Sequence, residues 1–435
     1  MKRALLVLVM AALPAAAADP TVVVLRGGRI VPVSGPVIEK GVVVLSGGKI
    51  AAVGADVAVP PGATVIDVQG QTVYPGLIDA LSQVGLTEIS SVRATNDTTE
   101  VRDFNPQVKA WVALNPYTSH IPVARANGIT AVQSVPQGKP ISGQAAVIRL
   151  AGTTPDALTV KAASSMQMTY PGGAVSDDDD DDDAEKSDDA DTYTLADRLK
   201  EKKDNQKKAL DKIANLLDEA KAYGAAVDAA AGGKAETPKP DPVLEGLVAV
   251  VRGTLPLEIR ADNEDDIRGA VAFAEAHGLK LTIAGGLEAW RCADLLKQKD
   301  VAVLLKVLRL PRRRSDPYDA AYANAAVLQK AGVRFAIVTD DDAFCRNLPF
   351  EAAMARAFGL GADNALRAIT LSPAEILGVA DRMGSLDAGK DANVVVANGD
   401  IMDNRTRVTH VFIDGVEQSL ETRHTRLADA FRDRP

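Results

Sequence analysis

The sequence predicts an α/β protein, a (β/α)8 TIM-type barrel with a small β-sandwich domain built from both chain ends. The middle of the chain alternates helical patterns with buried apolar strands at a spacing of about 20–30 residues, as parallel β/α units do. Segments rich in β-branched residues lie near both ends of the chain. With 435 residues, 46% of them hydrophobic and 25% charged, the chain is long enough for one large domain and a small one.

Residues 1–18 have the three-part layout of a secretory signal peptide. Lys2 and Arg3 precede a short apolar run at 4–13, and small residues at 16–18 offer a cleavage site. The run is too short to span a bilayer. We therefore exclude 1–18 from the fold and expect a periplasmic or secreted protein without a membrane anchor after cleavage; an uncut anchor is the alternative.

The remaining boundaries follow from changes in pattern along the chain. Residues 19–74 contain β-branched runs separated by Gly-Gly and Pro-Pro turns, and form the first part of the small β domain. The barrel is expected over 75–381. The second part of the small β domain follows at 382–420, and 421–435 is a tail.

The barrel segment repeats the plan of helix, glycine stop and strand. Asn263 is a plausible cap of one helix and Gly278 its stop, and the apolar strand LKLTIA follows. The number of such units favours a barrel over an open doubly wound sheet, which is the alternative fold. Since no GxGxxG motif follows an early strand, a dinucleotide site lacks support.

An insert at about 171–240 interrupts the barrel. Its run at 177–191 holds ten Asp and dominates the net charge of −9, and such a run predicts a solvated loop. A calcium-binding loop is the alternative, although the run lacks the glycine and closing Glu of an EF-hand. A Lys-rich helix follows, and its apolar face comprises Leu210, Ile213, Leu217 and Ala220. A lid and a surface decoration both remain possible roles for the insert.

Two motifs resemble the amidohydrolase superfamily, specifically its imidazolonepropionase-like members. They are TVYPGLIDA at 72–80 and LSPAEILGVADRMGSLDAGKDANVVVANGD at 371–400. The resemblance covers nearly all the chain after the signal, except the insert. It implies one or two divalent metals at the barrel mouth, held by a His-x-His on strand one, single His residues on strands five and six and an Asp on strand eight. Such a metal acidifies a water that attacks a C–N bond.

This sequence departs from the pattern at the ligand positions. Leu81 and Gln83 stand at the two His positions of strand one, Arg260 at that of strand five, and Gly285 and Gly286 at that of strand six. Leucine and glycine side chains offer no ligand atom, and a protonated arginine repels a cation. Of the family's ligands, only the Asp of strand eight is present in this sequence, as Asp340. We therefore predict no metal ligands and no cofactor.

Polar residues at the strand ends define the candidate site. We predict Asp340 as a catalytic general base, and we predict that substrate is bound by Gln83, Gln133, Arg260, Glu288 and Arg346. Arg260 either clamps a ligand carboxylate or neutralises Asp340. Of Asp340, Asp341 and Asp342, at most one or two can converge, because neighbouring strand residues face opposite ways.

The histidines and cysteines add little to this site. Two cysteines exclude a disulfide-stapled scaffold, and sequence does not decide whether Cys292 and Cys345 pair. We expect structural or surface roles for all four histidines, namely His120, His277, His410 and His424.

Two functions follow from these observations. The first is an exported hydrolase acting on non-peptide C–N bonds without the usual metal centre. The second is an inactive barrel that binds a ligand or acts as a scaffold. The expected partner is a small-molecule ligand, and a homo-oligomer is possible. Nucleic acid is excluded, because the charge is negative and no basic stripe carries interleaved aromatics.

Overall fold

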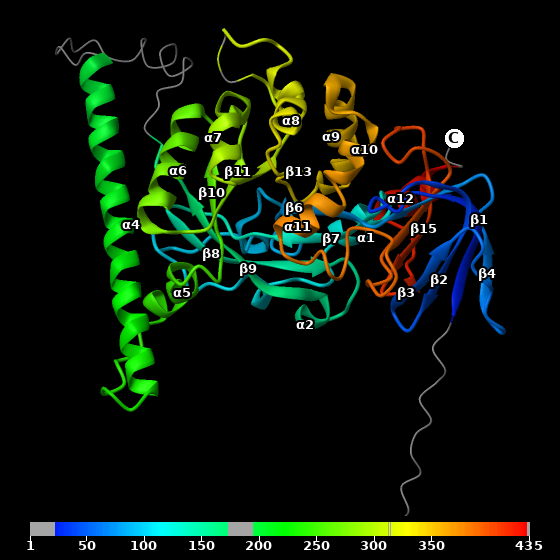
Figure 1. Ribbon diagram of the computed structural model, residues 1–435, viewed down its shortest axis with the longest axis horizontal. Coiled ribbons are helices and arrows are strands. Elements are labelled where there is room, and N and C mark those ends of the chain that lie inside the picture. Colours follow the sequence, from blue (N-terminus) through cyan, green and yellow to red (C-terminus); the bar gives the residue numbers. More distant parts are fainter. Residues whose placement is uncertain (1–21, 173–194, 312, 314, 433–435) are drawn as a thin grey trace, which may run out of the picture.

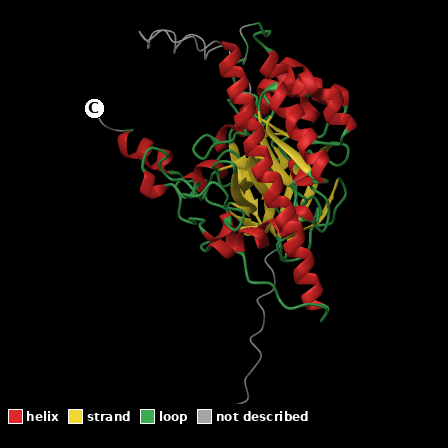
Figure 2. Cartoon of the chain, turned by 90° about the vertical axis from the view of Figure 1, so that its left-hand side faces the viewer, coloured by secondary structure: helices red, strands yellow, loops and turns green. Residues whose placement is uncertain are grey.

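The computed structural model describes residues 22–172, 195–311, 313 and 315–432. The signal region and the Asp-rich run therefore lie outside the described residues. Two eight-stranded sheets organise the chain. Figure 1 shows the blue N-terminal strands beside the red C-terminal ones at one end of the molecule, and Figure 2 shows the strands at its centre with helices around them.

The first sheet is assembled from strands near both ends of the chain. Strand β5 pairs antiparallel with β14 and parallel with part of β1, which joins the two portions. All eight strands pair within one sheet of the described chain, with β4 branching from β1, so that the pairing itself does not divide them into two layers. The strands are β1 (Val23–Ile30), β2 (Ile38–Ser46), β3 (Lys49–Gly54), β4 (Thr64–Asp67), β5 (Thr72–Pro75), β14 (Val394–Ala397), β15 (Val408–Ile413) and β16 (Val416–Glu417).

The second sheet is the barrel, and its strands follow one another in chain order. They are β6 (Leu77–Ser82), β7 (Ile129–Ser134), β8 (Ile141–Arg149), β9 (Thr159–Thr169), β10 (Leu257–Ala261), β11 (Leu281–Gly285), β12 (Ala302–Leu305) and β13 (Phe335–Ile337). The barrel is nearly closed, because the backbone N–H of Asp340, just after β13, donates to Leu81 O in β6 at 2.9 Å. An apolar cluster that includes Ile78, Ala131, Leu304 and Ala336 fills its interior.

One strand corrects the expectation of an all-parallel barrel. Strand β8 runs antiparallel to both β7 and β9. Only residues 135–140 separate β7 from β8, whereas a parallel crossover needs a dozen residues or more. The short connection therefore forces a hairpin, and the third barrel strand is reversed while the others stay parallel.

Helices cover the barrel. The cap and stop predicted for α6 are confirmed, because the Asn263 side chain accepts from Asp266 N, and Gly278 ends the helix with φ +67°. The α-helices are α1 (His120–Arg125), α2 (Pro155–Leu158), α4 (Leu195–Ala231), α5 (Pro242–Val251), α6 (Glu264–His277), α7 (Ala293–Gln298), α8 (Ala320–Ala331), α9 (Leu348–Ala355), α10 (Ala362–Arg367), α11 (Leu371–Ile376) and α12 (Arg423–Phe431). Single helical turns lie at Arg93–Thr95, Ala110–Val112, Ala289–Cys292 and Cys345–Asn347, and Arg356–Leu360 forms a π-helical turn.

The described part of the insert is the long helix α4, which runs along one side of the molecule (Figure 1). Ile213, Leu217 and Ala220 are buried, and Leu210 is half-buried, which confirms the predicted apolar face. Burial of such a face stabilises a helix whose other sides are charged. No helix within the described residues is long and apolar enough to cross a membrane.

Candidate functional site at the barrel mouth

Three barrel strands bring an arginine, a carboxylate and an amide together at the mouth. Arg260, near the end of β10, makes two hydrogen bonds to Asp340, from Nη1 to Oδ2 at 2.5 Å and from Nη2 to Oδ1 at 2.9 Å. Gln83, just after β6, donates from Nε2 to the same Oδ1 at 3.3 Å. The side chain of Asp340 is 9% exposed and that of Arg260 is 30% exposed. Both carboxylate oxygens of the predicted base are thus engaged by donors.

The backbone of Asp340 adopts the left-handed conformation, with φ +52°. Aspartate tolerates this region better than most residues. The turn separates it from its neighbours, because Asp341 accepts from Phe344 N and Asp342 from Ala343 N, which ties both to the following loop. Only Asp340 of the three makes hydrogen bonds to Arg260, and the turn after β13, not alternation along a strand, separates it from Asp341 and Asp342.

Arg260 remains charged in this setting. Burial alone lowers the pKa of its guanidinium, but the hydrogen bonds and the negative charge of Asp340 outweigh burial and raise the pKa. The second of the two roles left open for Arg260, neutralisation of Asp340, is therefore realised in the structure. The remaining N–H groups of the guanidinium stay available on its other edges.

Below this pair, Gln133 and Glu258 lie inside the barrel. Gln133 is fully buried, and its Nε2 contacts Ser164 Oγ at 3.0 Å, Ser165 Oγ at 2.8 Å and Glu258 Oε2 at 3.2 Å. Burial raises the pKa of Glu258 to about 7, against the lowering effect of its hydrogen bonds with Ser165, Gln133 and Gln167. A carboxyl group with such a pKa can exchange a proton near neutral pH.

The other two predicted substrate-binding residues are held elsewhere. The Glu288 carboxylate is 1% exposed, accepts from Glu264 N at 2.7 Å, and receives Arg313 Nε at 3.0 Å. It therefore fastens the 306–319 loop to the start of α6. Arg346 lies over the Phe344 ring, 5.6 Å from its centroid, and lines a separate cavity outside the barrel. The structure thus brings Gln83, Arg260 and Asp340 together, with Gln133 behind them, and leaves Glu288 and Arg346 apart.

A cavity of about 340 Å³ opens beside Arg260 between β9, β10 and the loop that joins β7 to β8. Its polar lining comprises Thr99, Gln137, Lys139, Ser142, Gln167, Thr169 and Arg260. Sequence reasoning missed Gln167 and Lys139. The signal for Gln167 was its place in the alternating run SSMQMT, where every second side chain of a buried strand faces the barrel interior.

The residues at the family's metal positions do not fit a metal ion. Leu81 is a buried leucine, and a protonated Arg260 occupies the side of Asp340 that a cation would approach. Gly285 has φ +94°, and a Cβ there would lie 2.4 Å from Asp262 Oδ1, so that a histidine is not accommodated. No group of three or more His, Cys, Asp or Glu side chains suited to a metal occurs within the described ranges.

The contacts of the four histidines are with residues other than Arg260 and Asp340. His120 Nε2 lies 2.9 Å from Glu88 O, and His277 contacts the Phe273 ring. His410 pairs with Glu417 at the small sheet, and His424 lies on α12. These contacts agree with the structural and surface roles expected for them.

Three further groups with raised pKa values are buried in the barrel domain: one carboxyl and two thiols. Burial raises the pKa of Asp79 to about 7, although Asp79 accepts hydrogen bonds from Thr339, and the pair links β6 to the end of β13. Cys292 and Cys345 are both buried and free, which answers the question of their pairing. Burial raises the pKa of both thiols, so neither is a ready nucleophile.

Comparisons with known proteins agree with this architecture. The model of the Amidohydrolase family matches residues 180–417. Amidohydrolase tasK of Hapsidospora irregularis is 23% identical over 377 residues, which cover 83% of this chain and 38% of that protein. The chain therefore spans less than half the length of this curated relative.

The chain is also similar to solved structures. An amidohydrolase from Thermotoga maritima MSB8 is 27% identical with a TM-score of 0.77, over 91% of this chain and 99% of that one. A prolidase complexed with N-methylphosphonate-L-proline is 17% identical with a TM-score of 0.52, over 92% and 100% of the two chains, and shares the fold. The family match and the Thermotoga maritima structure support an amidohydrolase-type hydrolase as the general class. The chain belongs to the Amidohydrolase family, as a divergent member whose described residues lack the metal-binding histidines.

Proposed function

We propose that the barrel mouth binds a small anionic molecule, and that it does so without the metal-bound water of the family. The ion pair between Arg260 and Asp340 carries this proposal. Its two hydrogen bonds place a permanent organic cation against the one carboxylate that remains of the ligand set. A divalent ion that approached Asp340 would have to displace this guanidinium.

The cavity beside the pair has the size and charge for such a ligand. Its volume of about 340 Å³ lies within the range of small-molecule sites, about 300–1,000 Å³. Lys139 and Arg260 are the charged residues in its lining, and Asp340 already balances one of them. The free edges of Arg260, the Lys139 ammonium and the amide of Gln167 can therefore hold a carboxylate.

A second candidate is a hydrolase of non-peptide C–N bonds that works without a metal. Family membership supports it, and so does Glu258, whose pKa of about 7 suits a general acid or base. Arg260 and Gln83 occupy the carboxylate oxygens of Asp340, and its catalytic role stays a prediction. In this scheme the polar residues next to Arg260 would orient the substrate, and Glu258 would exchange the proton.

Rebuilding the ligand set tests the proposal directly. The triple variant L81H/Q83H/R260H places three imidazoles around Asp340, which is the number of protein ligands a zinc site needs. We expect the purified wild type to carry no stoichiometric zinc after dialysis, and the triple variant to take up about one zinc ion. The variant R260H alone is the matched control and should bind zinc weakly. Stoichiometric zinc in the wild type would overturn the metal-free site.

Activity then separates the two candidates. Wild type and E258Q are assayed with hydantoin-like, imidazolone and Xaa-Pro substrates, and a carboxylate series is titrated by calorimetry. Binding without turnover supports the binding protein. Turnover that E258Q or D340N abolishes, in protein free of metal, supports the hydrolase instead.

We also propose export to the periplasm or the medium, based on residues 1–18, and self-association of the chain, based on the family resemblance. A fusion of residues 1–18 to a reporter enzyme tests export. Light scattering of the purified protein tests self-association, and a strictly monomeric mass would contradict it.

A further inference from the structure

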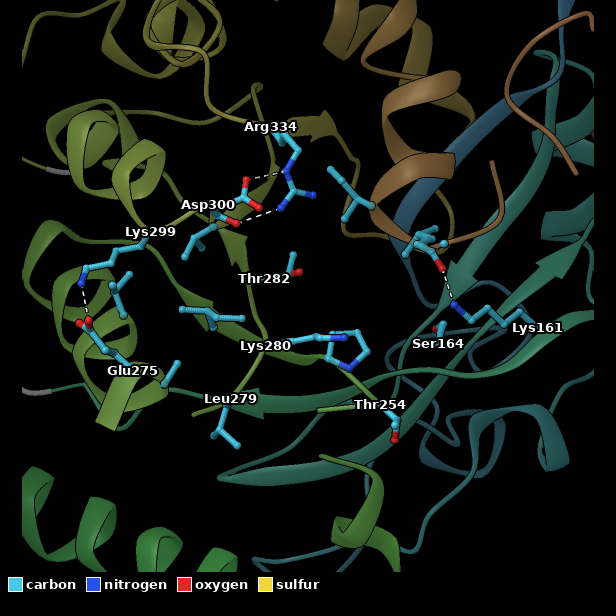
Figure 3. Close-up of a pocket in the computed structure, with 18 residues that line it drawn as sticks. Lys161, Ser164, Thr254, Glu275, Leu279, Lys280, Thr282, Lys299, Asp300 and Arg334 are labelled. Carbon is cyan, nitrogen blue, oxygen red and sulfur yellow. Dashed lines mark hydrogen bonds and ion pairs between the residues drawn. The ribbon is translucent and has the colours of Figure 1, made fainter. Parts of the chain in front are cut away.

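A second and larger cavity lies at the opposite end of the barrel. Its volume is about 600 Å³, and it opens at the amino ends of β10, β11 and β12, next to the end of α6 and the loop after α11. Figure 3 shows charged side chains pointing toward it from several elements. The predicted site residues of the mouth do not line it, and neither candidate function uses it.

Cations outnumber carboxylates around this cavity. Lys299 pairs with Glu275, and Arg334 Nε lies 3.0 Å from Asp300 Oδ1. The charged lining comprises Lys161, Glu275, Lys280, Lys299, Asp300 and Arg334, which is an excess of two positive charges. Two ion pairs therefore account for only part of the positive charge.

The excess resides on Lys161 and Lys280. Lys161 Nζ donates to Leu377 O at 2.8 Å, and this carbonyl carries no formal charge. Lys161 is half-buried; burial lowers the pKa of its ammonium, and the negative charge of Asp381 offsets part of that effect. Within the described part of the chain, Lys280 makes no side-chain hydrogen bond or ion pair, and Figure 3 places it between Thr282 and Thr254.

The rest of the lining defines what such a ligand must look like. Val271, Leu279 and Ile376 form an apolar wall, and the hydroxyl groups of Ser164 and Thr282 add hydrogen-bonding groups. An apolar wall beside these two lysines suits a molecule with an apolar body and two negative charges. Inorganic anions would use the cations and leave the apolar wall unfilled.

We infer that this cavity is a second binding site, separate from the mouth, for a small organic dianion with an apolar body. Lys280 and Lys161 contact its two negative charges, and the wall formed by α6 and the Leu377 segment covers its apolar side. The ion pairs of Lys299 and Arg334 form the rim of the site.

Phthalate is a suitable probe, because it joins an aromatic ring to two carboxylates. We expect calorimetry to detect binding to the wild type, and K280M or K161M to weaken it about tenfold, the loss of one charge-assisted hydrogen bond. The variant K207M removes an exposed lysine of α4 and should bind as the wild type does. Neutral dimethyl phthalate should not bind. Equal affinity in the wild type, K280M and K161M would overturn the inference.

A further variant separates this site from the mouth. Hydrogen exchange with bound phthalate should slow at 279–282 and 299–301, and K139M should leave that protection intact. Protection confined to 136–142, lost in K139M and kept in K280M, would locate phthalate at the mouth alone. The second site would then be refuted, whereas the proposed function would stand.

Discussion

The two ends of the barrel differ in how their charged side chains are paired. At the mouth, the carboxylate of Asp340 is buried and paired with Arg260. At the amino ends, the pair of Arg334 with Asp300 is exposed, and Lys280 has no partner within the described residues. A buried pair is costly to break, whereas an exposed cation is free to meet a ligand. The carboxylate at the mouth is therefore already neutralised, whereas a lysine at the amino end has no ion-pair partner among the described residues.

This contrast also separates the chain from the usual chemistry of its family. A metal site needs several ligand side chains that are not already paired with a cation. The mouth keeps one carboxylate, Asp340, and Arg260 neutralises it. The charge that remains available to a ligand at the mouth comes from Lys139 and the outer edges of Arg260. A site of this kind recognises anions more readily than it activates water.

Breaking the mouth pair should give the largest effect. R260M leaves Asp340 buried without a cation, and we expect the free energy of unfolding to fall by about 4 kcal/mol. The double variant R260M/D340N removes both charges and should recover most of that loss. Urea unfolding at pH 7 measures both variants. A double variant as unstable as R260M would show that packing of the arginine, and not its charge, dominates.

The buried carboxyl groups should give a dependence on pH. The pKa of Glu258 is about 7 in the folded state and 4.5 without the protein environment. The folded state therefore holds this proton more tightly, and its contribution to stability is greatest below pH 4.5 and falls as the pH rises to 7. Asp79, with a pKa of about 7, acts in the same direction.

Replacing Glu258 by an uncharged isostere isolates its part. Between pH 5 and pH 8, we expect the unfolding free energy of E258Q to rise relative to wild type by about 3 kcal/mol. E236Q, in an exposed loop, is the control and should follow the wild type at every pH. Parallel curves for E258Q and wild type would mean that Glu258 is ionised throughout and that the cavity reaches it.

Several residues of the mouth can be predicted from the sequence alone, because residues at the ends of barrel strands lie at the mouth. Gln83, Arg260 and Asp340 were placed at strand ends and do meet there. Neutralisation of Asp340 by Arg260 was one of two expected roles. Family motifs at 72–80 and 371–400 placed the two strands that join the small sheet to the barrel.

What the sequence could not supply was the partner that each polar side chain meets. The short connection at 135–140 indicates that β8 is reversed. The prediction of an all-parallel barrel instead followed the repeating pattern of helix and strand in the rest of the barrel. Glu288 appeared to face the mouth, whereas Arg313 from a distant loop holds it. The amino-end cavity was not foreseen, because its lysines come from strand starts and loops, where no motif marks a site.

Loosening the second buried ion pair should have a smaller effect than R260M. E288Q keeps an acceptor for Glu264 N but loses the charge that holds Arg313, and we expect a loss of about 2 kcal/mol in unfolding free energy. E264Q, which breaks the pair with Arg268 on the surface of the same helix, should cost about 0.5 kcal/mol or less. Thermal unfolding compares the two. Equal shifts would mean that burial of Glu288 adds nothing to its ion pair.

The smallest change in stability is expected at the amino end, where it should nevertheless alter binding. D300N removes an exposed carboxylate, so the unfolding free energy should change by about 0.5 kcal/mol or less. The same substitution frees Arg334 and raises the positive excess of the cavity, and the affinity for phthalate should increase by about threefold. High salt should reduce that gain, since the charges are exposed to solvent. If D300N destabilised the fold as much as E288Q does, the exposed pair of Arg334 and Asp300 would matter as much as a buried carboxylate, and the contrast in charge pairing would fail.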